Sequence, residues 1–172
     1  MSPVKFNQKQ IEQKFKIMDT VLTKINGSED VTNLENDKLR ALICFYKAFN
    51  QRDLKLMQNV WLNNNEASMN NPVGGIMRGW NNIDSVYEKI FNGKAKVNVE
   101  FYDFTFHSTD NMFFVTGRER GFFEKENLKI DLAIRTSRVF IRENGDWKHI
   151  QHHGSIDNPE LLRKYQEAIL NK

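Results

Sequence analysis

A chain of 172 residues with 40% hydrophobic and 12% aromatic residues is long and apolar enough to bury one core, which excludes an intrinsically disordered protein. A single cysteine, Cys44, excludes an intramolecular disulfide and a cysteine-based zinc site. The longest apolar stretches contain only a few residues, far short of the roughly 20 that span a membrane.

The formal net charge of +3 is concentrated at the start of the chain. Residues 1–26 carry five lysines against Glu12 and Asp19, whereas the 20 basic and 20 acidic residues that follow cancel. Proteins that bind nucleic acid present a concentrated basic surface to the phosphates. The neutral body of this chain therefore predicts no nucleic-acid partner.

The N-terminal segment has the spacing of an amphipathic helix, with these residues on one face: Ile11, Phe15, Met18, Leu22 and Ile25. We expect such a helix to pack on the body or on a partner subunit; its lysine-rich polar face leaves a membrane-surface helix as the alternative. Because charges interrupt every apolar run, the segment does not resemble a secretory signal, and a cytoplasmic protein without membrane attachment is expected. This extension, residues 1–36, would end in a polar linker over 27–36.

Three helices are predicted at the start of the body. Apolar residues at helical spacing mark residues 37–51, and Asp53 is placed to cap a short second helix. A strand signal at 66–70 ends in a turn around Pro72. A third amphipathic helix follows over about residues 82–92.

From residue 95 the apolar period changes from helical spacing to two, which predicts four strands. Asn144 and Gly145 predict a tight hairpin turn between the last two of them. Pro159 then begins a C-terminal helix, which makes up the C-terminal segment of residues 157–172. This order predicts an α+β fold in which helices cover one face of a curved antiparallel sheet.

Several segments resemble the SnoaL-like, nuclear-transport-factor-2-like superfamily. Residues 45–54 are similar to the opening helix and turn of that fold, and residues 77–80 to the entry of its third helix. The most specific likeness is the closing hairpin, where residues 137–140, 144–147 and 153–155 also resemble the association domain of calcium/calmodulin-dependent kinase II. The resemblance covers about residues 37–156.

The resemblance implies a cone-shaped fold, in which three N-terminal helices pack on a strongly curved antiparallel sheet and a pocket opens between them. Members of the superfamily commonly dimerise through the outer face of the sheet. In this chain two predicted strands carry apolar residues on both faces, which favours a homodimer; Phe113, Val115, Val139 and Ile141 oppose Phe114, Ile134 and Phe140.

The steroid-isomerase branch of the superfamily transfers a proton with residues that can be compared with this chain. Its general base is an aspartate just before a Pro-Val-Gly turn, and Asn71 occupies that position here. An amide cannot accept a proton at neutral pH, so this mechanism lacks its base. The tyrosine that donates to the oxyanion falls by spacing on Phe45, with Tyr46 one residue away on a different face. Proton transfer of this type is therefore not expected.

SnoaL-like cyclases place acid and base residues on the later strands. Residues of the right chemical type are Asp103, Glu119, Asp131 and His153. Asp131 lies on the face of its strand opposite the apolar residues Ile130 and Leu132, so its side chain is expected on a solvated face. Asp103 shares the parity of the apolar residues on its strand, and His153 resembles a recurring histidine near the end of the last strand. These two are the candidate catalytic residues.

Arginines are the strongest polar candidates for ligand binding. Arg118 matches by its position an arginine of the kinase association domain, whose pocket is lined by arginines. Paired guanidiniums suit bidentate recognition of carboxylates, so Arg118 and Arg138 predict a pocket for a small organic ligand such as a carboxylate. An ordinary salt bridge is the alternative for each. Further candidates for ligand binding are Tyr46, Trp61, Asn71 and Tyr87.

Arg138 has the sharpest expectation attached to it. If Leu132 and Ile134 face the helices, the alternation of side chains along a strand directs Arg138 inward as well. A bulge after Thr136 would reverse this alternation and turn Arg138 outward. A buried guanidinium needs a carboxylate, carbonyl groups or a bound anion. We expect Arg138→Ala to abolish carboxylate binding and to leave the fold intact.

Three histidines near the end of the chain do not have the spacing of a metal site. On a strand, His149 and His153 point one way and His152 the other, and no adjacent carboxylate or cysteine accompanies them. We therefore expect no metal ion and no cofactor.

Two functions remain open. The first is a non-catalytic pocket protein that binds a small molecule as a homodimer, and the second is an enzyme of the cyclase, isomerase or dehydratase type. A pocket carboxylate within hydrogen-bond reach of a histidine or tyrosine would favour the enzyme. A pocket with arginines alone would favour binding.

Overall fold

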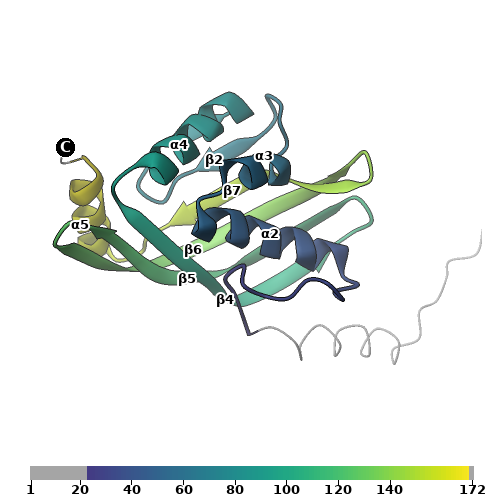
Figure 1. The fold of residues 1–172 in the computed structure, drawn as a ribbon, viewed down its shortest axis with the longest axis horizontal. Coiled ribbons are helices and arrows are strands. Elements are labelled where there is room, and N and C mark those ends of the chain that lie inside the picture. Colours follow the sequence, from purple (N-terminus) through teal and green to yellow (C-terminus); the bar gives the residue numbers. More distant parts are fainter. Residues whose placement is uncertain (1–22, 171–172) are drawn as a thin grey trace, which may run out of the picture.

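Three helices lie together on the concave face of a curved sheet in the computed structural model, which describes residues 23–170 (Figure 1). They are α2 (Asp37–Gln51), α3 (Leu54–Val60) and α4 (Trp80–Asn92). The predicted helix over 37–51 is confirmed, and the Asp53 carboxylate caps α3 by accepting a hydrogen bond from the Leu56 N–H at 2.9 Å. The third helix begins two residues earlier than its apolar spacing predicts.

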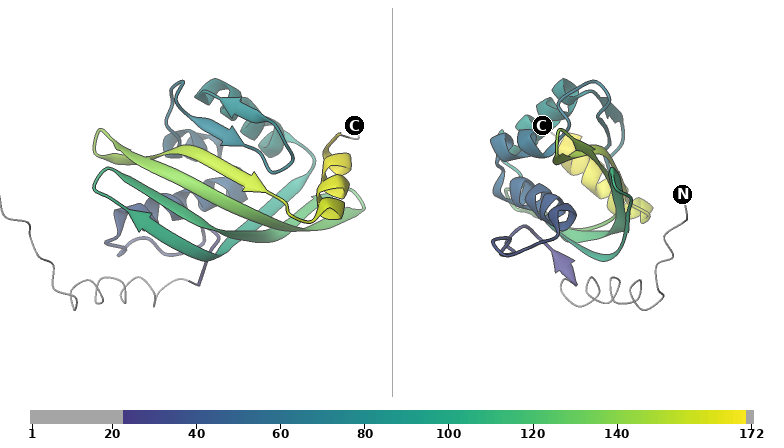
Figure 2. Two further views of the ribbon diagram at one scale, coloured as in Figure 1. Left: turned by 180° about the vertical axis from the view of Figure 1, so that it is seen from behind. Right: turned by 90° about the vertical axis from the view of Figure 1, so that its right-hand side faces the viewer.

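The strands form a seven-stranded sheet in the order β1-β4-β5-β6-β7-β2-β3 within residues 23–170. All neighbours are antiparallel except β2 and β7. The strands are β1 (Lys24–Ile25), β2 (Ser68–Asn70), β3 (Ile76–Arg78), β4 (Lys96–Ser108), β5 (Met112–Lys125), β6 (Leu128–Glu143) and β7 (Asp146–Ser155). The predicted α+β fold with a curved sheet is confirmed, and the figures show the long strands wrapping around α2 (Figure 2).

The two turn residues determine the geometry of the hairpin between β6 and β7. Asn144 and Gly145 both have positive φ angles, 52° and 92°, as a two-residue turn of the mirror-image type requires. The short strand β3 follows the turn at Gly74 and Gly75. It pairs with β2, so that the two strands extend the sheet beyond β7.

The N-terminal extension joins the sheet where a helix was predicted. Lys24 and Ile25 pair with Tyr102 and Phe101 at the edge of β4, and Ile25 is fully buried. The helix prediction is therefore wrong at Ile25, because this apolar residue belongs to the sheet core and not to the face shared by the residues before it. The other four residues of that predicted face lie outside the described residues.

Asn50 at the end of α2 fastens this edge to the body. Its Nδ2 donates to the carbonyl oxygens of Asn26 and Val99, at 2.8 Å each, and its Oδ1 accepts from the Val99 N–H at 3.0 Å. Next to it, Gly27 lies so close to the backbone of Lys47 on α2 that a Cβ would come within 2.1 Å of the Lys47 nitrogen. The segment after β1 is therefore packed directly on α2.

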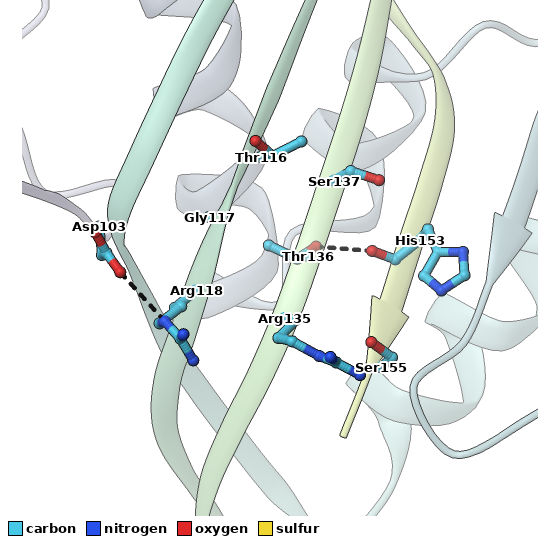
Figure 3. A pocket seen from close by; sticks show the side chains of 9 residues that line it. All are labelled: Asp103, Thr116, Gly117, Arg118, Arg135, Thr136, Ser137, His153 and Ser155. Carbon is cyan, nitrogen blue, oxygen red and sulfur yellow. Dashed lines mark hydrogen bonds and ion pairs between the residues drawn. The ribbon is translucent and has the colours of Figure 1, made fainter. Parts of the chain in front are cut away.

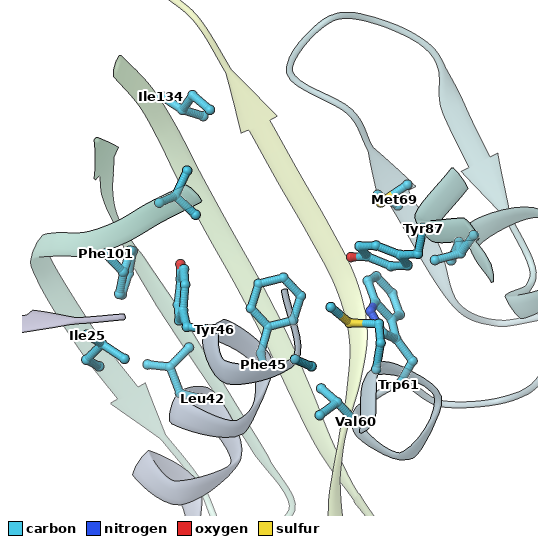
Figure 4. Packing of buried hydrophobic residues seen from close by; sticks show 14 of the residues in the cluster. Ile25, Leu42, Phe45, Tyr46, Val60, Trp61, Met69, Tyr87, Phe101 and Ile134 are labelled. Carbon is cyan, nitrogen blue, oxygen red and sulfur yellow. The ribbon is translucent and has the colours of Figure 1, made fainter. Parts of the chain in front are cut away.

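Aromatic rings fill the space between the helices and the sheet (Figure 4). Phe113 on β5 and Phe140 on β6 stack with their ring centroids 4.5 Å apart, and Tyr46 on α2 stacks on Phe101 of β4 at 5.5 Å. All four are fully buried or nearly so. Aromatic pairs in this geometry stabilise the fold beyond the effect of the area that they bury. The apolar faces of the helices and of the strands thus pack into one core.

The C-terminal helix α5 (Pro159–Leu170) lies at one end of the sheet, away from the closing hairpin (Figures 1 and 2). The Asn158 side chain caps it by accepting from the backbone N–H groups of Glu160 and Leu161, at 3.0 Å each. Tyr165 packs edge-on against Phe123 of β5 at 5.4 Å. Across residues 23–170, no helix has the length and hydrophobicity to cross a membrane.

Candidate functional site

A cavity of about 70 Å³ lies inside the cone, between the helices and the inner face of the sheet. It adjoins a wider groove of about 430 Å³ next to α5. The two spaces have these lining residues in common: Phe49, Asn71, Ile90, Val97 and Tyr165. Phe45 and Tyr87 line the cavity, and in Figure 4 Phe45 lies between Tyr46 and Tyr87. The fold therefore contains an interior pocket that continues into a groove.

Arg138 brings a charge into this apolar interior. The pairing of β6 with β5 is regular along its whole length, so Ile134, Thr136 and Arg138 all face inward and are buried. The guanidinium carbon lies 3.6 Å from the centre of the Phe45 ring, in the geometry of a cation–π contact. The side chain lines the cavity and is only 2% exposed.

Glu119 and Tyr46 complete a closed network with Arg138. Arg138 Nη2 donates to Glu119 Oε1 at 2.7 Å, and Arg138 Nε donates to Tyr46 Oη at 3.2 Å. The Tyr46 hydroxyl in turn donates to Glu119 Oε1 at 2.7 Å. Arg138 Nη1 is buried and has no hydrogen-bond partner among residues 23–170. Arg138, which lines the cavity, thus keeps one N–H-bearing nitrogen without a partner in the described part of the chain.

Burial sets the protonation states of this network. It raises the pKa of Tyr46 well above its usual range, although the Arg138 charge works in the opposite direction. Burial by itself would lower the pKa of Arg138, but Tyr46 and Glu119 outweigh it and raise that pKa. At neutral pH, Tyr46 is therefore a neutral hydrogen-bond donor and Arg138 is a cation.

Two buried histidines flank the network. His149 packs among the rings of Trp61, Phe140 and Phe45, with centroids 4.0, 4.7 and 5.2 Å away. His152 lines the cavity, and its Nε2 lies 3.1 Å from Thr136 Oγ1. Burial lowers the pKa of both histidines well below the usual range, and the Arg138 charge lowers it further. Both imidazoles are neutral at pH 7.

The strand parity predicted for the histidines is wrong. The register of β7 against β6 shifts between His149 and Gln151, so that His149 and His152 both face the interior and His153 faces outward. Such a bulge places two residues opposite one and reverses the alternation beyond it. No group of three or more histidine, cysteine, aspartate or glutamate side chains in the described part of the chain could hold a metal ion.

Three predicted site residues lie on the outer face of the sheet, away from the pocket. Asp103 and Arg118 form an exposed ion pair at 3.2 Å, and His153 lies on the same face (Figure 3). The His153 Nδ1 lies 3.2 Å from Asn70 Nδ2. All three line an open depression of about 400 Å³ on this face. The expectation that Asp103 and Arg118 face the pocket is wrong. An irregularity in β4 after Tyr102, where Asp103 has a φ of 48°, turns the Asp103 side chain outward.

The remaining candidates lie at or behind the pocket. Asn71 and Tyr87 line the cavity, and Asn71 also fixes the turn after β2 because its Oδ1 accepts from the Val73 N–H at 3.1 Å. Tyr46 reaches Arg138 and Glu119 as described. Trp61 is fully buried behind His149 and does not line the cavity. Tyr46, Asn71, Tyr87 and Arg138 are thus brought together, whereas Arg118 is not.

Glu119 and His152 are site residues that the sequence analysis did not select. Glu119 was one of four acid or base candidates, and it shares the parity of Phe113 and Val115 on its strand. An acidic residue at the end of an apolar row is the same signal that selected Arg138, so parity could have found it. His152 could not be found in this way, since the bulge in β7 has no local sequence signal.

Comparison with known proteins agrees with the architecture. The model of the SnoaL-like domain family matches residues 40–159. No curated protein matches the chain in sequence. A structure from Streptomyces avermitilis, assigned as a dehydratase of the NTF2-like family, has 20% identity over 69% of this chain and 92% of its own, with a TM-score of 0.63.

Two further solved structures show the same likeness. One, from Thiobacillus denitrificans, is assigned as a calcium/calmodulin-dependent protein kinase type II association domain and has 19% identity over 69% of this chain and 93% of its own, with a TM-score of 0.58. The other, an NTF2-like protein from Cytophaga hutchinsonii, has 18% identity over 72% of this chain and 98% of its own, with a TM-score of 0.58. At such identities the likeness shows the fold alone.

Proposed function

Because the chain belongs to the SnoaL-like domain family, we propose that it binds a small organic molecule in the interior pocket and the adjoining groove. The observation that carries this proposal is Arg138, whose side chain lines the cavity and whose buried Nη1 has no hydrogen-bond partner within residues 23–170. A buried donor without a partner costs about 1–3 kcal/mol, and a ligand acceptor would remove that cost. Apolar walls with a few placed polar groups are typical of small-molecule sites.

The charge around Arg138 favours a neutral acceptor over a carboxylate at this point. Glu119 already compensates the guanidinium, and both side chains are nearly excluded from solvent, with 2% and 5% exposed. A second carboxylate next to Glu119 would meet a like charge in a poorly solvated space. We therefore assign a carbonyl oxygen to Arg138 Nη1, where the sequence alone favoured a carboxylate.

Binding of a simple ketone tests this proposal. We expect 2-octanone to bind in isothermal titration calorimetry, because its carbonyl can accept from Arg138 and its alkyl chain can lie along the apolar groove. Ala95→Trp, which fills the groove, should abolish the binding. The matched control Ser85→Trp lies on the exposed side of α4, outside the lining of the cavity and the groove, and should bind normally. No binding to the unaltered chain, or equal binding by both variants, would contradict the proposal.

An enzyme is the second candidate: Glu119 lines the cavity within hydrogen-bond distance of Tyr46, which favours an enzyme, but the same Oε1 also accepts from Arg138. In such a reaction the Glu119 carboxylate would take a proton from the carbon next to a ketone, and the enolate oxygen would accept from Arg138. Return of a proton from the carboxyl group would complete an exchange. The measurement is deuterium incorporation into 2-octanone in D₂O by NMR. Incorporation above buffer, lost in Tyr46→Phe, is expected for the enzyme; a rate equal to buffer leaves a binding protein.

We also infer that the chain forms a homodimer through the outer face of the sheet. Met112 and Phe114, two positions apart on β5, are 45% and 40% exposed there, and neighbouring exposed apolar side chains favour an interaction surface. Sedimentation at micromolar concentration should give a dimer, and Phe114→Glu should shift it to a monomer. A monomeric unaltered chain would contradict this inference.

A further inference from the structure

We propose that the groove next to α5 selects amphipathic organic anions, with the anionic end at the groove rim and a neutral acceptor at Arg138. This inference rests on the proposed function and names its ligand class. The ligand would have three parts: a carbonyl or similar acceptor at the inner end, an apolar body, and a carboxylate or equivalent anion at the outer end.

The rim of the groove is basic. Lys89 on α4, Lys94 after α4 and Lys125 at the end of β5 all line it. Within residues 23–170, no acidic side chain lines the groove. Lys89 and Lys94 are exposed, and neither forms an ion pair in the described part of the chain. Lys89 and Lys94 therefore carry positive charge at the groove mouth that no ion pair within residues 23–170 neutralises.

Helix capping does not account for these lysines. Arg52 occupies the end of α4, where its Nη2 donates to the carbonyl oxygens of Ile90 and Gly93 at 2.7 Å each and of Ala95 at 2.9 Å. Orphan carbonyl groups at a helix end are a common reason for nearby basic residues. Because Arg52 already donates hydrogen bonds to those carbonyl oxygens, Lys89 and Lys94 remain available to bind an anion in the groove.

The order of charges along the site sets the direction of the ligand. At the inner end, Glu119 neutralises Arg138 and would repel an anion. At the outer end, Lys89 and Lys94 are in contact with solvent, so an anion can stay hydrated beside them. The surface between these ends is mainly apolar, from residues such as Phe49, Ile90 and Phe123. The anion therefore belongs at the rim and the neutral acceptor inside.

Three ketones that differ at one end test the inference: 2-octanone, 7-oxooctanoic acid and 8-amino-2-octanone. Calorimetry at low salt should show that the acid binds about tenfold more tightly than the neutral ketone, as expected for two exposed ion pairs. The ammonium compound should bind more weakly than the neutral ketone. The advantage of the acid should shrink at high salt, because the rim charges are exposed.

Variants locate the effect. Lys89→Gln combined with Lys94→Gln should remove the preference for the acid over 2-octanone. Lys47→Gln on the exposed side of α2, outside the groove lining, is the control and should keep the preference. If 2-octanone binds but the acid binds no better, the rim inference is wrong and the proposed function stands. If none of the three compounds binds, both fail.

Discussion

Replacing Arg138 with methionine is expected to lower the free energy of unfolding by about 3–5 kcal/mol, because it leaves the Glu119 carboxylate buried without its cation. The two side chains are 2% and 5% exposed, and no other cation bonds to Glu119 in the described part of the chain. Urea denaturation of the variant and the unaltered chain measures the difference. This expectation replaces the one drawn from the sequence, in which loss of Arg138 leaves the fold intact.

Two control variants show whether the loss of stability comes from an uncompensated buried charge or only from the lost contact. Combining Arg138→Met with Glu119→Leu removes both charges, and the double variant should recover most of the lost stability. Arg118→Met breaks an ion pair of similar length, but its side chains are 53% and 70% exposed, so it should cost at most about 1 kcal/mol. Equal losses at Arg118 and Arg138, or a double variant less stable than Arg138→Met, would contradict the expectation.

Acid is expected to destabilise the fold between about pH 6.5 and pH 5, through His149 and His152. Burial holds the pKa of both imidazoles well below the usual range in the folded chain. In the unfolded chain a histidine has a pKa of about 6.5, so the unfolded state binds more protons throughout this window. The free energy of unfolding therefore falls as the pH falls, by up to about 1.4 kcal/mol per pH unit for each histidine.

His149→Phe is the variant that checks this pH dependence. His149 already lies among three aromatic side chains, and neither of its ring nitrogens has a well-formed hydrogen bond within the described residues. A phenyl ring should therefore fit the site and carry no proton. Urea denaturation at pH 7.5, 6 and 5 should show about half the loss of stability of the unaltered chain. An unchanged slope would mean that His149 is not protonated on unfolding.

Much of the fold could be predicted from the sequence because local rules and periodicity apply there. Helix α2 has the bounds that its apolar spacing predicts, Asp53 caps α3, and Asn144 with Gly145 forms the hairpin turn. Each of these depends on residues a few positions apart. The inward direction of Arg138 follows in the same way, since β6 keeps its alternation against β5 without interruption.

The pocket chemistry was decided by the tertiary structure alone. Arg138, Glu119 and Tyr46 come from β6, β5 and α2, and no local pattern states that their polar atoms meet. Irregularities in β4 and β7 sent Asp103 outward and His152 inward, because one extra residue in a strand reverses the face of every residue beyond it. Alternation in a sequence shows which residues of a strand share a face. Only the pairing of the strands in the sheet decides which face points to the core and where a bulge reverses it.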